Sequence, residues 1–298
     1  MSTPPAAAHG GVPTPQFALA PEPATLFARR AERLRKLAEG SPLAPYLGFL
    51  AALADTQHAL AEAAPPAEAP EAAPRSGMPP LDRARLAEAP EMAAALGAFL
   101  GRGATLDMPA PARLALEALA ASPEAQAAAL GRVLADRLAE DAVAADLFAA
   151  AAAQVEMARR AAALDDASLA PVATGICPAC GGQPVASIVA ADLRVLEGTR
   201  YACCATCATR WNEVRIKCLA CGSLKGIAYR GLEAEGIPEP AIKAETCSEC
   251  GRWLKIMYQI RDAGLDPVAD DVASLGLDLL MRETEWSRAG FHPFLAGY

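Results

Sequence analysis

Apolar side chains in the first half of the chain recur at every third and fourth position, which is the period of an amphipathic helix. From Ala24 the pattern continues until Gly40-Ser41-Pro42 ends it. The same spacing predicts further helices over 43–63, 84–100, 110–121, 123–138 and 141–163. Ser122 is a suitable N-cap for the fourth of these because Pro123 follows it at the first turn. We therefore expect residues 24–170 to form an all-helical domain.

Two proline-rich stretches interrupt this pattern. Residues 1–23 are rich in Pro and Ala without a helical or strand period, and we expect a disordered arm. The stretch 65–80 contains six prolines and is expected to be a surface loop or linker.

The pattern changes near Pro171, where β-branched residues and glycines replace the helical period. Short strands are predicted at 185–189, 199–202, 214–217, 227–232 and 242–245. A last helix is predicted over 267–288, capped by Asp266 and opened by Pro267. Asp270 and Asp271 in its first turns are expected to stabilise the positive helix end.

Composition restricts the function. The net charge of −8 and the pI near 5.1 argue against a general binder of nucleic acid or anionic membranes. Residues 1–15 lack the features of a signal peptide, and the apolar stretch 142–157 is interrupted by Asp146, Gln154 and Glu156. We expect a cytoplasmic protein with no membrane insertion.

All nine cysteines fall between positions 177 and 250, and eight of them form C-x-x-C pairs. The pairs are Cys177/Cys180, Cys204/Cys207, Cys218/Cys221 and Cys247/Cys250. Random placement would give about 0.3 such pairs, so the pattern indicates metal knuckles. Two thiolates at this spacing can bind one ion from a single tight turn, and two turns complete a tetrahedron.

A glycine follows three of the pairs, at Gly181, Gly222 and Gly251. There it can adopt the positive φ that turns N–H groups toward sulfur. Ala208 follows the remaining pair, and that knuckle is expected to be less regular.

Joining consecutive turns predicts one metal site from the first two pairs and a second from the last two. Segments of 23 and 25 residues separate the paired turns, which suits one or two strands each. Two other groupings of the four turns remain possible. Cys203 is left over, and we interpret it as incidental. The fold class predicted is α+β: an N-terminal helical bundle, two rubredoxin-like or zinc-ribbon-like knuckle modules over 171–213 and 214–298, and a C-terminal helix.

Other uses of the cysteines are less consistent with the sequence. Disulfides would be reduced in the cytoplasm, and no βαβ pattern surrounds the pairs as in a thioredoxin-like redox protein. All-sulfur ligand sets leave no open position for Lewis-acid catalysis. His9, His58 and His292 are interpreted as surface or capping residues. We therefore predict no catalytic residue and no enzyme activity.

Four groups of residues carry a resemblance to a known family. They are Cys177-Pro178-Ala179-Cys180-Gly181 with Pro184-Val185-Ala186-Ser187; Cys204-Ala205-Thr206-Cys207 with Trp211, Val214, Arg215 and Lys217-Cys218; Lys243-Ala244-Glu245-Thr246-Cys247 with Cys250 and Leu254-Lys255; and Asp270-Asp271-Val272-Ala273-Ser274-Leu275 with Pro293-Phe294-Leu295. From Leu81 to the C-terminus the chain resembles FdhE, the accessory protein of formate dehydrogenase formation. The family often has histidine after the tryptophan, where this chain has Asn212.

The resemblance implies a cytoplasmic assembly factor with two rubredoxin-like iron centres. Its partner would be the catalytic subunit of respiratory formate dehydrogenase, which carries the molybdenum or tungsten pterin and is exported folded. The four-thiolate sets themselves leave iron and zinc open, because both accept this geometry.

Two other functions compete with assembly. An iron centre could pass electrons or sense oxygen, whereas zinc has no redox chemistry. A nucleic-acid-binding zinc ribbon would use the basic residues near the knuckles, which are Arg194, Arg200, Arg210, Arg215, Lys217 and Lys225. Acidic and apolar residues are interleaved with these, so we interpret them as a solvated surface and expect no nucleic-acid partner.

Overall fold

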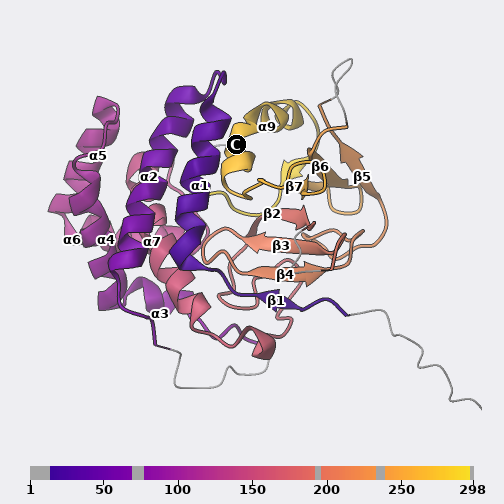
Figure 1. The fold of residues 1–298 in the computed structure, drawn as a ribbon, viewed down its shortest axis with the longest axis horizontal. Helices are drawn as coiled ribbons and strands as arrows, with labels where there is room; N and C mark the ends of the chain where they lie inside the picture. The colour runs from indigo at the N-terminus through magenta and orange to yellow at the C-terminus, as the bar shows by residue number, and fades with distance from the viewer. Residues whose placement is uncertain (1–13, 69–76, 192–195, 233–238, 296–298) are drawn as a thin grey trace, which may run out of the picture.

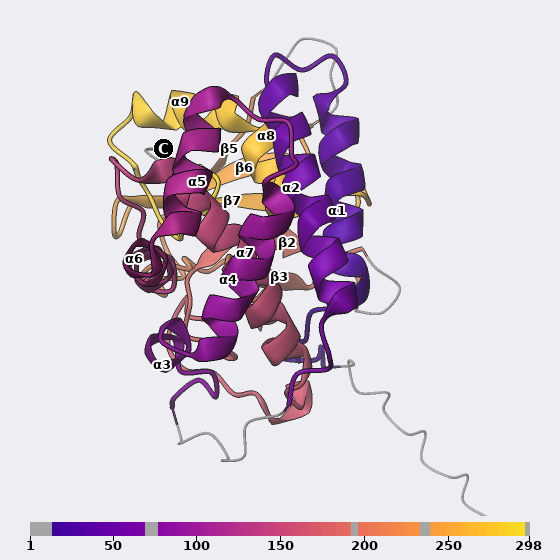
Figure 2. The ribbon, with the colours of Figure 1, turned by 90° about the vertical axis from the view of Figure 1, so that its left-hand side faces the viewer.

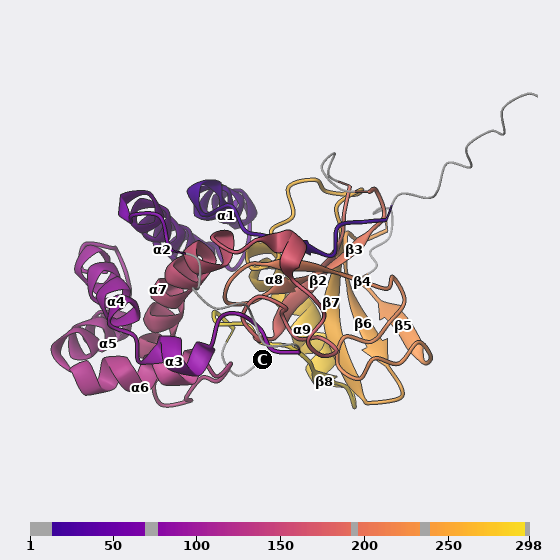
Figure 3. The same cartoon turned by 90° about the horizontal axis from the view of Figure 1, so that it is seen from below.

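The helices of the first half and the strands occupy opposite sides of the molecule in the computed structural model, which describes residues 14–68, 77–191, 196–232 and 239–295 (Figure 1). The view from below shows the helices of the first half beside the sheet formed by the second (Figure 3). The α+β class with N-terminal helices is confirmed. Among the described residues, no helix combines the length and the apolarity needed to cross a membrane.

The helices follow the predicted order closely. They are α1 (Pro23–Ala38), α2 (Ala44–Ala63), α3 (Arg83–Ala87), α4 (Pro90–Gly103), α5 (Ala110–Ala121), α6 (Pro123–Val133) and α7 (Val143–Ala162), with a 3-10 turn η1 at Asp166–Ser168. Ser122 caps α6, its Oγ accepting from Ala125 N at 3.1 Å. The single helix predicted over 84–100 is wrong. It is two helices, because Ala89 before Pro90 adopts an extended ψ of 136°.

Helix α7 is the centre of the helical layer (Figure 2). Its residues Ala149 to Ala153 are fully buried, and their small side chains let the neighbouring helices approach closely. The buried Gln154 on α7 accepts from Gln57 Nε2 at 3.0 Å. It also donates to the backbone oxygen of Ala205 at 2.7 Å. A satisfied polar contact thus joins the helical layer to a cysteine knuckle.

One mixed sheet contains all the strands of the described residues. They are β1 (Ala18–Leu19), β2 (Pro184–Val189), β3 (Arg200–Cys204), β4 (Arg210–Glu213), β5 (Ile227–Arg230), β6 (Ile242–Cys247), β7 (Arg252–Tyr258) and β8 (Ser287–Arg288). Their order is β1-β4-β3-β2-β7-β6-β5, with β8 also paired to β7. The pairing of β2 with β7 is parallel and joins the predicted knuckle modules into one sheet.

Three of the observed strands differ from what the sequence predicts. The strand expected over 214–217 lies earlier, at Arg210–Glu213, and Val214 and Ile216 are 59% and 54% exposed. Strand β7 was not predicted, although it is an apolar run interrupted by Lys255. The predicted disordered arm is wrong for residues 14–23, since β1 pairs with β4 there. Residues 1–13 lie outside the described residues.

The predicted C-terminal helix over 267–288 is also wrong. The chain forms α8 (Ala269–Ala273), α9 (Leu275–Arg282) and then β8. The Lys255 ammonium donates to the backbone oxygens of Asp271 at 2.7 Å and Ser274 at 3.2 Å, at the junction between α8 and α9. Asp266 does cap this region, because its Oδ1 accepts from the N–H groups of Val268 and Ala269.

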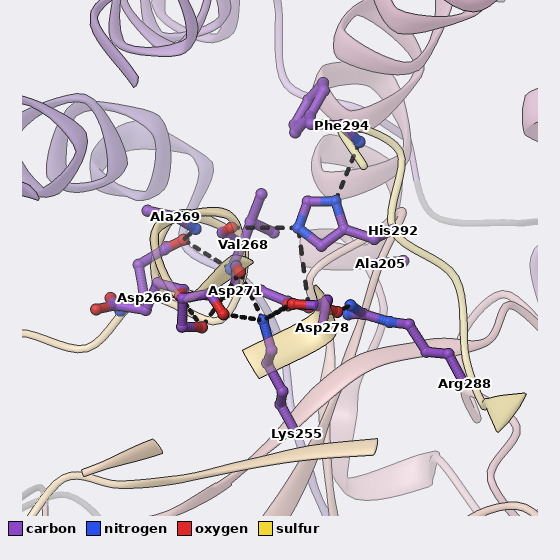
Figure 4. A network of polar contacts seen from close by, with 12 residues as sticks. Ala205, Lys255, Asp266, Val268, Ala269, Asp271, Asp278, Arg288, His292 and Phe294 are labelled. Carbon is purple, nitrogen blue, oxygen red and sulfur yellow. Dashed lines mark hydrogen bonds and ion pairs between the residues drawn. The ribbon is translucent and has the colours of Figure 1, made fainter. Parts of the chain in front are cut away.

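A buried ion network explains this geometry (Figure 4). Lys255 Nζ lies 2.7 Å from Asp271 Oδ1, and it also pairs with Asp278. Arg288 pairs with both carboxylates, so two positive charges balance two negative charges. The helix-end role predicted for Asp271 is therefore wrong, because its side chain is a fully buried ion-pair partner.

Asp270 likewise does more than stabilise a helix end. Its carboxylate accepts from Arg33 on α1 in a bidentate contact, at 2.6 Å and 2.9 Å. Arg30 donates to Asp266 at 3.1 Å one turn earlier. Burial nevertheless raises the pKa of Asp270 to about 6. These two arginines tie the first helix to the last helical segment.

The predicted surface or capping role of His292 is wrong as well. Its ring is buried, Nδ1 accepts from Phe294 N at 3.1 Å, and Nε2 lies 3.2 Å from Val268 O (Figure 4). This pattern requires the tautomer with the proton on Nε2, which donates to Val268. Burial lowers the pKa of His292 to about 4, so the ring is neutral at physiological pH.

The neutral ring predicts an acid sensitivity. The folded pKa of about 4 lies below the unfolded value of 6.5, so the unfolded state binds a proton first. Stability from this site is present above pH 6.5 and lost as pH falls toward 4, by about 3 kcal/mol in all. Ring proton shifts in an NMR titration should stay at neutral values down to about pH 5. A His292→Gln variant should lose less stability over the same interval, and a ring that titrates near pH 6.5 would contradict the assignment.

Candidate metal centres

The four cysteine knuckles occupy equivalent places in two successive halves of the sheet. Cys177 and Cys180 precede β2, Cys204 ends β3, and Cys207 lies in the turn from β3 to β4. In the second half one knuckle precedes β5 and the other lies in the turn from β6 to β7. Each half therefore runs knuckle, strand, strand, knuckle, strand.

The sulfur atoms converge in two groups of four. The first group, site one, is Cys177, Cys180, Cys204 and Cys207; the second, site two, is Cys218, Cys221, Cys247 and Cys250. Within each group the Sγ atoms all lie within 4.8 Å of one another. This is the grouping that joining consecutive turns predicts.

The sulfur separations fit a tetrahedral ion. At site one, Cys177 Sγ lies 3.6 Å from Cys207 Sγ, and Cys180 Sγ lies 3.5 Å from Cys204 Sγ. At site two the distance from Cys218 Sγ to Cys250 Sγ is 3.7 Å, and that from Cys221 Sγ to Cys247 Sγ is 3.8 Å. A tetrahedron with metal–sulfur bonds of about 2.3 Å has edges of about 3.8 Å. Disulfide sulfurs would lie about 2.05 Å apart, and all nine cysteines are free.

All four knuckles share the left-handed residue after the second cysteine. Gly181, Gly222 and Gly251 have φ of 74°, 80° and 66°, and Ala208 has φ of 60°. The N–H groups of the three glycines each donate to the oxygen of the first cysteine at 2.9 Å. The described residues of the Ala208 knuckle lack the equivalent bond to Cys204 O, which agrees with the expectation that this knuckle is less regular. Ala208 keeps the turn, but in a backbone conformation that L residues disfavour.

Backbone N–H groups also point at sulfur. Ala220 N lies 3.3 Å from Cys218 Sγ, and Thr206 N lies 3.4 Å from Cys204 Sγ. Such bonds stabilise a thiolate, since the acceptor carries negative charge.

The two sites differ in exposure. All four cysteines of site one are buried, whereas at site two Cys221 is exposed and Cys250 is half-buried. Burial raises the pKa of the Cys177 thiol well above its usual range. A cluster of buried thiolates needs a cation to offset its charge, which is the chemistry of a metal ligand set.

Site one also has a charged neighbour that the sequence did not indicate. Arg83 on α3 pairs with Asp136 at 2.6 Å and donates to Thr206 Oγ1 at 3.3 Å. Burial lowers the pKa of Arg83, but Asp136 and the sulfurs of Cys180 and Cys204 outweigh it and leave the pKa raised. A guanidinium beside four thiolates reduces the net charge of the centre.

Arg200 is the charged residue next to the knuckles of site two. Its interpretation as a surface residue is wrong. It is 1% exposed and donates to Ser187 Oγ on β2. It also donates to Lys217 O, just before Cys218, and to Glu245, just before the other knuckle, at 2.9 Å each. One side chain from the first half of the sheet thus holds the backbone approach to both knuckles of site two.

The remaining cysteine, Cys203, and the other candidate residues lie outside the two sulfur groups. Cys203 lies outside both groups, with its Sγ 3.8 Å from Tyr201 O, and burial raises its pKa to about 11. It stays a neutral thiol, as an incidental residue should. Asn212, at the position where the family often has histidine, donates from its amide to Arg200 O at 3.0 Å. His58 lies 3.6 Å from Glu62 on α2, while His9 and Arg194 lie outside the described residues.

The left-handed turn residues generate a prediction. Ala208→Gly should relieve backbone strain and stabilise the protein by up to about 1 kcal/mol. Gly251→Ala is the matched reverse change, because a Cβ there meets nothing within 4 Å and only the φ of 66° is unfavourable. It should destabilise by about 1 kcal/mol. Thermal unfolding of both variants at equal metal content measures the effect, and changes of the same sign would contradict it.

Comparisons with known proteins agree over the whole chain. Family models of FdhE match as the N-terminal part over 15–174, the central domain over 176–215 and the C-terminal domain over 216–295. An FdhE homologue of Rhizobium meliloti is 50% identical over 97% of this chain and 96% of its own. One of Edwardsiella ictaluri is 38% identical over 93% and 90%.

A solved structure agrees as well. The crystal structure of the FdhE protein from Pseudomonas aeruginosa matches with a TM-score of 0.82 at 35% identity. The match covers 94% of this chain and 99% of that one. With three family models, close relatives and a shared fold, the chain belongs to the FdhE family.

Proposed function

We propose that this protein is an accessory factor in the assembly of formate dehydrogenase, and that it binds the immature catalytic subunit in the cytoplasm. Membership of the FdhE family supports the assembly role. The observation that carries the metal part is the convergence of eight cysteine sulfurs in two groups, each with the edge lengths of a tetrahedron.

Each cysteine group would hold one metal ion, and we propose iron. Cys177, Cys180, Cys204 and Cys207 would be the ligands at site one, and Cys218, Cys221, Cys247 and Cys250 those at site two. Four thiolates suit iron or zinc equally, so the proposal of iron rests on the family. Metal analysis and a visible absorption spectrum of protein purified without air distinguish the two, because a thiolate-bound ferric ion absorbs visible light and zinc does not.

The partner role predicts the outcome of a genetic test. Deleting the gene should abolish formate dehydrogenase activity, and the wild-type gene should restore it. Cys177→Ser and Cys247→Ser should each lose one metal ion and fail to restore activity, while the helical layer persists by circular dichroism. Cys203→Ser is the matched control and should retain two ions and full activity. Full activity in the deletion strain would refute the assembly role, and two ions in Cys247→Ser would refute the ligand assignment.

A redox function is a second candidate, favoured by the exposure of site two. Cys221 is exposed, so a metal there would lie close to the molecular surface, as transfer to a partner requires. Site one is enclosed by the helical layer and better suited to bracing the fold. Iron would be necessary for this function, and zinc-loaded protein that fully supports assembly would remove it.

The same difference in exposure predicts how the ions are lost. A chelator should remove the ion of site two at least about tenfold faster than that of site one, because release from a buried site needs local opening. Metal content followed over time should show two phases in the wild type. A Cys218→Ser variant should show only the slow phase. A single phase for both ions would contradict the assigned difference.

A further inference from the structure

Strand β5 is the terminal strand of the sheet and pairs on one side only, with β6. It lies on the side of the molecule away from α4, α5 and α6 (Figures 1 and 3). Three of its four residues are exposed. An edge of this kind offers unpaired backbone groups to another extended chain.

The register identifies which groups those are. Ser248 N donates to Gly226 O at 2.9 Å, and Ile227 lies opposite Cys247. In an antiparallel pair the bonded residues alternate, so Ala228 and Arg230 bond to β6. The N–H and C=O groups of Ile227 and Tyr229 therefore point outward, away from the sheet.

The segment carrying this strand differs in charge from the rest of the chain. Residues 214–232 contain four basic residues and no acidic residue, although the whole chain has a net charge of −8. The four are Arg215, Lys217, Lys225 and Arg230. Lys217 pairs with Glu213 at 2.8 Å, and Glu249 lies beside Gly226 on the facing knuckle. Arg215, Lys225 and Arg230 are exposed, and the last two lie just before β5 and at its end.

Apolar side chains are exposed in the same segment. Leu224 is 62% exposed, Leu232 is 49% and Tyr229 is 37%. Charges alone would protect an edge from other chains, but exposed leucines beside it do not. Single-stranded nucleic acid is bound by several aromatic rings that stack on successive bases, and this segment exposes only Tyr229, whereas aliphatic side chains around an open strand edge suit a protein segment.

We propose that β5 binds an extended segment of the client protein, rich in acidic and apolar residues, as an added strand. This rests on the proposed function, which supplies the immature catalytic subunit as the client. Backbone hydrogen bonds to Ile227 and Tyr229 give affinity, and the basic residues select an acidic segment. The added strand would lie next to site two, whose Cys221 is exposed.

A matched pair of variants tests the strand. Tyr229→Pro and Tyr229→Val lose the same phenol ring, but only proline removes the outward N–H, and the ladder to β6 remains. In the full-length, metal-loaded protein, Tyr229→Val should bind the purified immature catalytic subunit within about threefold of wild type. Tyr229→Pro should bind at least about tenfold more weakly. Unchanged metal content would show that both variants are folded.

Hydrogen exchange gives a second measurement on the wild-type protein. The amides of Ile227 and Tyr229 should exchange fast when the protein is free and slowly in the complex. Binding of the subunit without this protection, and with equal affinity for the two Tyr229 variants, would overturn the added strand but leave the proposed function intact. Absence of any binding to the wild type would overturn both.

The charge selection has its own control. Lys225→Glu should weaken binding about three- to tenfold and reduce its salt dependence. Arg85→Glu, at an exposed position on α3, should have no effect. Equal effects of the two would remove the role of the basic segment. Tight binding of a random-sequence RNA oligonucleotide that Lys225→Glu abolishes would assign this face to nucleic acid and overturn the proposal.

Discussion

The fold of the second half depends on bringing four sulfur atoms together twice. The strands have only two to seven residues and are joined by turns at nearly every step, so the positions of the turns decide the sheet. The cysteines lie at the turns that the sheet must hold in place. These turns come before β2 and β5, between β3 and β4, and between β6 and β7. A bound cation at each point would hold two turns together, and the stability of the sheet would then follow metal affinity.

The helical layer covers site one and leaves site two open to solvent. Gln154 on α7 and Arg83 on α3 both contact the knuckle of Cys204 and Cys207, so site one is enclosed by helices. Site two has strands on its inner side and solvent on its outer side. Arg200 compensates, since it reaches from the first half of the sheet to the backbone of Lys217 and the side chain of Glu245, which precede the two knuckles there. The two halves repeat in order, but burial gives them different chemical tasks.

The sequence was sufficient where a pattern is local. Helical periodicity located the helices, and C-x-x-C spacing located all eight sulfurs with their correct grouping. Sequence analysis failed where contacts between distant residues decide the local structure or the burial of a side chain. Lys255 binds the backbone at the junction of two helices, 16 residues further along the chain, and no local pattern indicates that a lysine in an apolar run will be buried there. Arg200, Asp270, Asp271 and His292 were all interpreted as surface or helix-end groups, because sequence cannot show that an ionic residue has a buried partner. The departure from glycine at Ala208 did indicate a less regular knuckle, although Ala208 keeps the left-handed φ of the other three turns.

Arg30 and Arg33 on α1 find their carboxylate partners at Asp266 and Asp270, which are 236 and 237 positions later. Tyr46 on α2 similarly donates to Phe294 O at 2.6 Å, close to the end of the chain. During synthesis the first two helices leave the ribosome long before these residues exist, and two guanidinium groups then have nothing to neutralise them. Such distant pairings slow folding and prolong exposure to proteolysis and aggregation. The buried ion pairs of Arg30 and Arg33 can therefore form only after residues 266 and 270 have been synthesised.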